Sequence, residues 1–124
     1  MGMVSKRVLV LDTSAFVAGF DPFSVGAEQY TVPLVREEIL GSSMIRVRFK
    51  TATDSGKLKV KTPDRLFMDN VKASAAAVGN SFFLSDADTQ VLALALQFKT
   101  LGYSPLILTD DYSIQNVAIQ VGIE

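Results

Sequence analysis

The stretch "LVLDTSAF", residues 9–16, is an apolar run that ends on an acid, Asp12. Consecutive Val and Leu residues are typical of a strand that is covered on both faces of a parallel sheet. Burying an ionised carboxylate costs several kcal/mol unless a partner compensates its charge. An acid at the end of a core strand therefore indicates a functional site, and its partner has to come from elsewhere in the chain.

Length and composition limit the chemistry that the chain can perform. Its 124 residues predict one domain, residues 1–124, and 48% hydrophobic with 20% charged residues is the balance of a globular protein. The sequence contains neither Cys nor His. This excludes disulfides, zinc sites built on thiolate or imidazole, and Ser-His or Cys-His dyads. Catalysis would have to use carboxylates, hydroxyls, amides or amines.

The apolar runs are too short for a membrane span, which needs about 20 residues. The N-terminal "MGMVSKRVLVLDTS" contains no apolar segment of signal-peptide length. We therefore expect no membrane association and a cytoplasmic location.

Apolar periodicity predicts strands alternating with helices, which indicates the α/β class: a three-layer α/β/α sandwich with a mostly parallel sheet. Residues 45–49 alternate as a strand does but could also continue the preceding helix. The expected strands are 6–12, 56–63 and 104–111, and the expected helices are 13–20, 30–44, 64–78, 84–103 and 112–122.

Three details of these elements are specific enough to check. Thr13 or Ser14 is placed to cap the first helix, and Thr31 to cap the second, with Pro33 in its first turn. We expect two buried stripes: Val35, Ile39 and Leu40 in helix 30–44, and Leu66, Phe67 and Val71 in helix 64–78.

Acidic residues recur at one level of this predicted fold. Asp12 and the pair Asp110/Asp111 follow strand ends, where open parallel sheets bind their ligands. Helices that run antiparallel to the strands would bring further acids to the same edge. These are Asp86 and Asp88 at the start of helix 84–103, and Glu37 and Glu38 in helix 30–44.

Clustered carboxylates repel one another unless they bind cations or retain protons. Oxygen ligands without nitrogen or sulfur favour Mg²⁺ or Mn²⁺, which commonly bridge to substrate phosphates. Such an ion can deliver a nucleophilic water and stabilise charge on a phosphodiester in reaction. A divalent cation would thus be the partner of Asp12.

Most of these acids also have a purely structural interpretation. Asp86 and Asp88 are placed to cap a helix, and one of Asp110 and Asp111 to form a turn or cap. Adjacent helical residues point about 100° apart, so one of Glu37 and Glu38 is a solvated surface acid. Asp12 is the hardest of the acids to explain by turn chemistry alone.

Four motifs in order across nearly the whole chain resemble those of the PIN-domain nucleases. They are Asp12 in "VLDTSAF", Glu38 in "YTVPLVREEI", Asp88 in "LSDADTQVLALAL" and the acidic "LTDD" before the last helix. Within that superfamily "LSDADTQVLALALQ" and "LTDDYSIQNVAIQVG" are similar to the Nob family. Its members are endoribonucleases that cut precursor small-subunit ribosomal RNA near its mature 3′ end.

The resemblance implies the roles of individual residues. Asp12, Glu38, Asp88 and one of Asp110 or Asp111 would be catalytic metal ligands, and Thr109 and Ser14 would orient them. The spacing after Thr109 favours Asp111 as the fourth ligand, and Asp110 stays open. Nob-family proteins usually continue into a zinc ribbon, for which this chain has no Cys; it is either an excised domain or a shorter relative.

A basic segment could hold the RNA substrate. Residues 46–65 contain seven of the 12 basic residues and two of the 13 acids. Such a segment can be a solvated face, but it can also bind phosphates beside an acidic site. The predicted RNA-binding residues are Arg46, Arg48, Lys50, Lys57, Lys59 and Lys61. Pre-ribosomal assembly factors are further expected partners.

Other functions share parts of this pattern. A toxin-type PIN ribonuclease of a toxin–antitoxin system would share the four acids, and a non-catalytic RNA-binding PIN module could retain them. A phospho-accepting signalling domain needs an acidic pair after the first strand, where Asp12 stands alone. A phosphatase with a nucleophilic Asp needs a second Asp where Ser14 stands.

Overall fold

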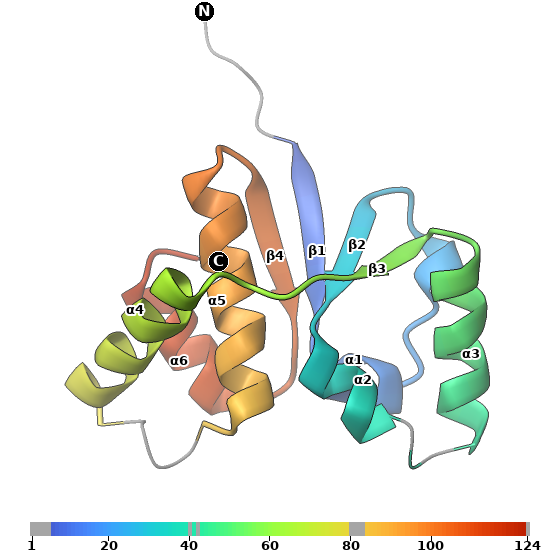
Figure 1. Ribbon diagram of the computed structural model, residues 1–124, viewed down its shortest axis with the longest axis horizontal. Coiled ribbons are helices and arrows are strands. Elements are labelled where there is room, and N and C mark those ends of the chain that lie inside the picture. Colours follow the sequence, from blue (N-terminus) through green and yellow to red (C-terminus); the bar gives the residue numbers. More distant parts are fainter. Residues whose placement is uncertain (1–5, 40, 42, 80–83, 124) are drawn as a thin grey trace, which may run out of the picture.

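The structure, a computed structural model, describes residues 6–39, 41, 43–79 and 84–123. Leu40, one of the residues predicted to be buried, lies outside this part. The described strands are β1 (Arg7–Leu11), β2 (Glu28–Thr31), β3 (Leu58–Val60) and β4 (Ser104–Leu108). They form one sheet in the order β3-β2-β1-β4, and every pairing is parallel. The mostly parallel sheet that the sequence predicts is confirmed (Figure 1).

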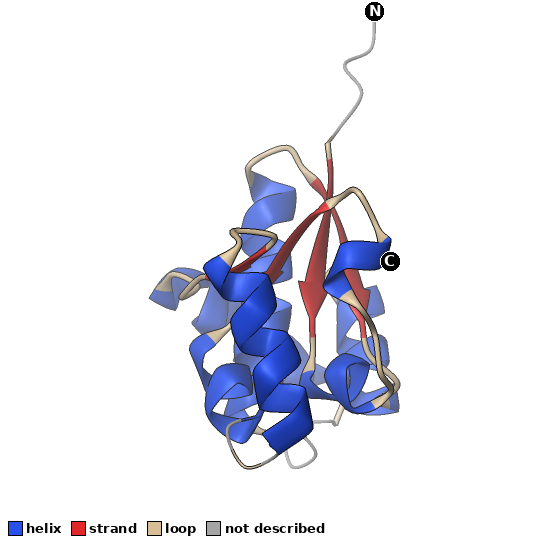
Figure 2. Ribbon diagram, turned by 90° about the vertical axis from the view of Figure 1, so that its right-hand side faces the viewer, coloured by secondary structure: helices blue, strands red, loops and turns tan. Residues whose placement is uncertain are grey.

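Helices lie on both sides of this sheet, as Figure 2 shows, which gives the predicted three-layer α/β/α arrangement. They are α1 (Thr13–Val17), α2 (Pro33–Ile39), α3 (Ser43–Asp54), α4 (Arg65–Ala77), α5 (Asp86–Thr100) and α6 (Tyr112–Gln120), with a short 3-10 turn at Pro22–Ser24. No helix in the described part of the chain is long and apolar enough to span a membrane.

Helix α5 is the centre of the core. Five consecutive residues, Val91 to Ala95, are buried, so this part of the helix is covered on all sides. Such a helix needs strong end signals, and α5 has a capping box in which Ser85 and Asp88 bond each other's backbone. The amide of Gln97 extends from α5 to the backbone N–H of Asp64, at 2.8 Å, and fixes the start of α4.

Strand β2 was missed by the sequence analysis, which assigned Tyr30 and Thr31 to a helix. Polar residues hide this strand, because the two side chains that point inward are Gln29, 1% exposed, and Thr31, fully buried. Gln29 donates to the carbonyl of Pro22 at 2.8 Å, and Thr31 donates to the carbonyl of Leu11 at 2.7 Å. Thr31 therefore links two strands and does not cap α2, which begins at Pro33.

The open assignment of residues 45–49 resolves to helix α3. Ile45, Phe49 and Ala52 face inward at helical spacing, whereas Val47 is 61% exposed. Phe49 meets Phe16 of α1 edge to face, with ring centroids 5.4 Å apart. The apparent strand alternation came from Val47, which points into solvent.

Two further expectations about helices need correction. Leu66 of α4 is 64% exposed, because the inward stripe runs through Phe67, Val71 and Ala75 and Leu66 lies about 100° away from it. The N-cap position of α1 is held by Asp12 instead of Thr13 or Ser14.

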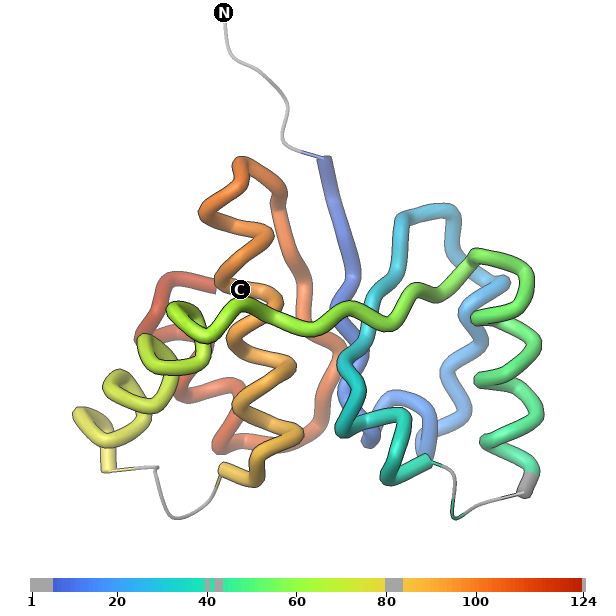
Figure 3. Tube along the Cα trace, in the orientation of Figure 1, coloured from blue at the N-terminus to red at the C-terminus, as the bar shows by residue number. Residues whose placement is uncertain are grey.

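The topology places the first and last strands of the chain side by side, with β4 at one edge of the sheet. Figure 3 shows the first strand (blue) beside the last (orange). In the register of this pair, Arg7 lies opposite Ser104 and Leu11 lies opposite Leu108. Because the strands are parallel, Asp12 and Thr109 emerge at the same edge. The residues at this carboxyl edge form the candidate site.

Candidate active site

Asp12 is a buried acid whose partners are hydroxyl groups. Its side chain is 5% exposed and makes no capping bond to α1. Its Oδ2 atom accepts hydrogen bonds from Thr109 Oγ1 at 2.9 Å and from Ser14 Oγ at 3.1 Å. No Lys or Arg nitrogen in the described residues lies within 4.0 Å of it. The protein therefore orients this carboxylate without neutralising it.

The same hydroxyls fix the loop after β4. Thr109 Oγ1 accepts from the backbone N–H of Asp111 at 3.1 Å, and Ser14 Oγ accepts from that of Asp110 at 3.2 Å. The two hydroxyl oxygens lie 3.4 Å apart. Ser14 and Thr109 thus both contact Asp12, and one network joins the acid after β1 to the loop after β4.

Asp88 shares the electrostatic environment of Asp12. Burial raises the pKa of the Asp88 carboxyl above its ordinary value of 3.8, and the negative charges of Asp12 and Asp111 raise it further, against hydrogen bonds to Ser85 that lower it. Asp88 accepts from the Ser85 N–H at 3.0 Å, as part of the α5 capping box. The capping interpretation is correct for Asp88, which belongs to the capping box of α5. In addition, the charges of Asp12 and Asp111 raise its pKa.

The two aspartates after Thr109 are placed differently. Asp111 is half-buried, holds the N-cap of α6 by accepting from the Ser113 N–H at 2.8 Å, and its charge contributes to the raised pKa of Asp88. Asp110 is exposed, and its charge is not among those that shift Asp88. The geometry therefore favours Asp111 over Asp110 as a member of the cluster.

Glu38 reaches the site through a residue that the sequence analysis did not assign. Thr13 Oγ1, one residue after Asp12, donates to Glu38 Oε1 at 2.6 Å. Helix α2 is held near α5 by a bond of 3.1 Å from the Leu34 N–H to the Gln90 side chain. A cleft between these helices, of about 390 Å³, is lined by Glu37, Glu38, Ser85 and Asp86 among others. The sequence feature that could have identified Thr13 as a site residue is its hydroxyl group directly after Asp12.

The four carboxylates share one feature of their hydrogen bonding. Each uses one oxygen to bind a protein donor, and the other oxygen makes no hydrogen bond within the described residues. Those other oxygens are accessible to solvent. Among the described residues, the one fully buried side-chain oxygen or nitrogen without a hydrogen-bond partner is Gln29 Oε1. The oxygens left for an external ligand are Asp12 Oδ1, Glu38 Oε2, Asp88 Oδ1 and Asp111 Oδ2.

This donor set fits a hard divalent cation in its chemistry, because it offers carboxylate oxygens that pair with no Lys or Arg in the described part of the chain. The acids are not gathered tightly: among the described residues no three acidic side chains stand close enough to hold one ion by themselves. Water or substrate oxygens would have to complete the coordination of a bound ion.

The predicted RNA-binding residues do not form one patch. Arg46, Arg48 and Lys50 lie on α3, where Lys50 pairs with Asp54 at 2.8 Å. Lys57 precedes β3 and lies at the amino ends of the strands, across the sheet from the acids. The expectation that the whole basic segment lies beside the acidic site is therefore wrong for Lys57. The reason is that α3 and β3 run in opposite directions.

The remaining two lysines follow the same strand. Lys59, in β3, has its Nζ 4.0 Å from Glu28 and 6.0 Å from the centre of the Tyr30 ring. Lys61 follows the end of β3 and its backbone N–H donates to the carbonyl of Thr31, so it is nearer to the carboxyl edge. An RNA-binding role for these six residues stays a prediction.

The structure is a parallel α/β/α sandwich with aspartates at the carboxyl edge of its sheet, and comparisons with known proteins give its family. Residues 9–98 match the family model described as PIN domain of ribonuclease. The chain belongs to the PIN-domain family of ribonucleases.

Several relatives are similar to the chain over most of its length. The chain is 41% identical to Endoribonuclease Nob1 of Methanocaldococcus jannaschii over 95% of its own length and 55% of that protein's. It is 38% identical to Endoribonuclease Nob1 of Pyrococcus abyssi, over 98% and 69% of the two chains. It is 32% identical to Ribonuclease VapC3 of Aeropyrum pernix, over 95% and 84%. The chain thus spans about half the length of the first of these relatives.

Proposed function

We propose that this protein is a divalent-metal-dependent endoribonuclease that hydrolyses single-stranded RNA, and that its substrate is precursor small-subunit ribosomal RNA at its 3′ end. The observation that carries the proposal is the buried Asp12, which is held by two hydroxyls and has no Lys or Arg partner among the described residues. Similarity to the proteins named Nob1 supports the choice of substrate.

The residues that would hold the cation are Asp12, Glu38, Asp88 and Asp111, with Asp110 as the alternative to Asp111. When bound, Mg²⁺ or Mn²⁺ supplies an activated water and stabilises the negative charge that develops on the phosphodiester. Each carboxylate would present the oxygen that the protein leaves unbonded.

The surrounding hydroxyls prepare this arrangement. Ser14 and Thr109 hold Asp12 Oδ2, which fixes the orientation of the carboxylate and leaves Oδ1 without a hydrogen bond among the described residues. Thr13 does the same for Glu38 through Oε1. Because these donors are neutral, they orient the carboxylates without lowering the net negative charge that attracts a cation.

A toxin-type role is the second candidate, because the similarity to the protein named VapC3 covers 84% of that relative. The carboxylate site would be the same in both cases. The two functions differ in the RNA that is cut and in the partners, which would be pre-ribosomal assembly factors for the ribosomal role. They do not differ in the residues of the site. For the ribosomal role we propose a cytoplasmic location.

An assay that separates them uses three RNAs: a fragment that spans the 3′ end of precursor small-subunit ribosomal RNA, a transfer RNA and an unstructured messenger RNA. Each is incubated with the protein in chelator and then with increasing Mn²⁺ or Mg²⁺. We expect metal-dependent cleavage of the ribosomal fragment at one position. Cleavage restricted to transfer or messenger RNA would favour the toxin role, and binding without cleavage at any metal concentration would indicate a non-catalytic module.

A further inference from the structure

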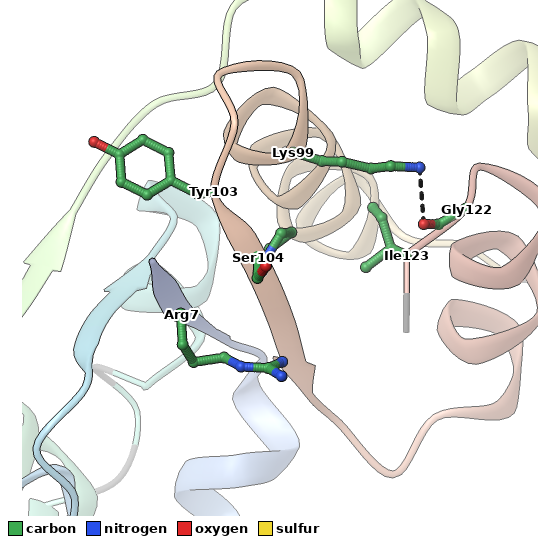
Figure 4. Close-up of a pocket in the computed structure, with 7 residues that line it drawn as sticks. Arg7, Lys99, Tyr103, Ser104, Gly122 and Ile123 are labelled. Carbon is green, nitrogen blue, oxygen red and sulfur yellow. Dashed lines mark hydrogen bonds between the residues drawn. The ribbon is translucent and has the colours of Figure 1, made fainter. Parts of the chain in front are cut away.

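A second polar cavity lies at the amino ends of β1 and β4, at the opposite edge of the sheet from the acids. Its volume is about 330 Å³, and its lining includes Arg7, Lys99, Ser104 and Ile123. Figure 4 shows the ammonium group of Lys99 and the guanidinium group of Arg7 on either side of Ser104. The cavity therefore joins two cations and a hydroxyl from three different elements.

Arg7 has a position that its strand fixes. It is the first residue of β1, pairs in register with Ser104 of β4 and is exposed. No carboxylate of the described residues lies within 4.0 Å of its guanidinium. Its planar set of donors matches the oxygens of a phosphate group, which it can bind through two parallel hydrogen bonds.

Lys99 is held in place by the chain after α6. Its ammonium donates to the carbonyl of Gly122 at 2.8 Å and lies 3.3 Å from that of Val121. An ammonium has three donors, so one remains for another acceptor. The backbone at Gly122 has a φ of +83°, and a Cβ there would lie 2.4 Å from Lys99 Nζ. Glycine at this position thus leaves the space that the ammonium occupies.

The two edges of the sheet differ in which charged groups lack a partner. At the amino edge Glu28 is ion-paired with Lys6, at 2.8 Å, and Asp54 with Lys50, whereas Arg7 and Lys99 have no carboxylate within 4.0 Å among the described residues. At the carboxyl edge the acids have no cationic partner among the described residues. A polyanion is therefore attracted to the amino edge, although the residues for chemistry lie at the other.

We propose that the Arg7–Lys99 cavity binds a backbone phosphate of the RNA strand that is cut at the carboxylate site. This inference rests on the proposed function and adds a remote contact to it. The five residues of β1 separate the two edges by about 16 Å, so the contacted phosphate belongs to a nucleotide several positions from the scissile bond. The cavity contributes binding energy to long substrates and nothing to short ones.

The test measures RNA affinity in chelator, where no cleavage occurs, by fluorescence anisotropy over a range of salt concentrations. The probe is a single-stranded RNA that spans the cleavage position with at least ten nucleotides on each side. We expect Arg7→Gln to weaken binding about tenfold and to lower the salt slope by about one. Arg7→Lys, which keeps the charge but loses the paired donors, should recover part of the affinity.

Lys72→Gln is the matched control, because Lys72 is an exposed cation on α4 and its loss changes the net charge equally. It should alter affinity by less than about twofold, as expected for a surface charge away from the ligand. Equal weakening by Arg7→Gln and Lys72→Gln would overturn the proposal, since it would show a general charge effect only.

Substrate length gives an independent readout. With Mn²⁺ present, Arg7→Gln should raise the KM for the long RNA about tenfold and leave its kcat unchanged, and it should leave both constants unchanged for an RNA of four nucleotides. A loss of kcat on the short RNA would place Arg7 in the catalytic machinery and overturn the remote contact. If no RNA were cut by any variant but Arg7→Gln still weakened binding, the proposed function would fail while the phosphate contact stood.

Discussion

The two edges of the sheet treat charge in opposite ways. At the amino edge, the hydrogen bond from Lys6 lowers the pKa of Glu28, and the same bond raises the pKa of Lys6. At the carboxyl edge Asp12 and Asp111 act on Asp88 in the other direction and raise its pKa. Among the described residues, Glu28 at the amino edge has a cationic partner, whereas Asp12, Asp88 and Asp111 at the carboxyl edge have none, as the proposed cation site requires.

Asp12→Asn should have the largest effect, because it removes the charge at the centre of the carboxyl edge. The amide keeps an oxygen that can accept from Thr109, so the fold is retained. We expect cleavage to fall by at least about 100-fold, in line with the loss of a metal ligand or transition-state contact. Single-turnover cleavage with saturating RNA measures the effect.

Asp69→Asn is the control for this variant, because Asp69 is an exposed acid on α4 and carries the same charge. It should cut at the wild-type rate, and both variants should bind RNA in chelator as the wild type does. Undiminished cleavage by Asp12→Asn would contradict the mechanism.

Thr109→Val sharpens the comparison by removing orientation without changing charge. Thr109 holds Asp12 Oδ2 and accepts from the Asp111 N–H, so its loss loosens two acids together. Residues that support metal ligands typically account for 10- to 100-fold in affinity or activity. We expect the Mn²⁺ concentration for half-maximal cleavage to rise by about that factor.

Thr109→Ser retains the hydroxyl and serves as the matched variant. It should require nearly the same Mn²⁺ concentration as the wild type. If Thr109→Ser and Thr109→Val behaved alike, the methyl group and its packing would be responsible, and the orienting role of the hydroxyl would be wrong.

The carboxyl edge was largely predictable from sequence because its signals are local. Asp12 ends an apolar run and Asp88 opens the strongest helix, so strand and helix directions suffice to place both acids at one edge. The spacing after Thr109 already favoured Asp111, and the structure adds that Asp111 is the more buried of the two and that its charge acts on Asp88. Thr13 was missed because its partner, Glu38, lies 25 residues away.

The amino edge was not predictable, because its cavity is assembled from unrelated positions. Arg7 and Lys99 are 92 residues apart and neither belongs to a basic run. The charged run that the sequence did reveal, residues 46–65, is divided by the structure between α3 and β3. The density of charge along the sequence identified a basic segment. Where its side chains lie on the surface depends on the directions in which α3 and β3 run.

Gly122→Ala tests how the amino edge is built. Alanine in a left-handed conformation costs about 1–2 kcal/mol, and its Cβ would meet the Lys99 ammonium. We expect a loss of stability of that size, measured by urea unfolding, together with weaker RNA binding as Lys99 moves.

The corresponding change at Gly56 separates these effects. Gly56 also has a positive φ, of +81°, but a Cβ there meets nothing within 4 Å. Gly56→Ala should therefore lose similar stability while RNA affinity is unchanged. Equal affinity in the two variants would mean that the position of Lys99 does not matter for RNA.

Asp88→Asn is expected to change stability in chelator by the smallest amount, and the direction of the change shows whether the charged carboxylate favours or opposes folding. Because the folded protein raises the pKa of Asp88 above its ordinary 3.8, its charged form opposes folding: stability is greatest below that value and falls as the pH rises through the folded pKa. In chelator at pH 7 the variant should therefore be more stable than the wild type. The gain should be less than about 1 kcal/mol, since Asp88 is only half-buried.

At about pH 3, where the wild-type carboxyl is mostly protonated, the two proteins should unfold at nearly the same temperature. Adding Mn²⁺ at pH 7 should reverse the order, because a cation stabilises the charged carboxylate of the wild type and has less to bind in the amide. If the wild type were instead the more stable protein at pH 7 without metal, the charge of Asp88 would already be compensated within the protein. Asp88 would then not belong to the uncompensated acids of the carboxyl edge.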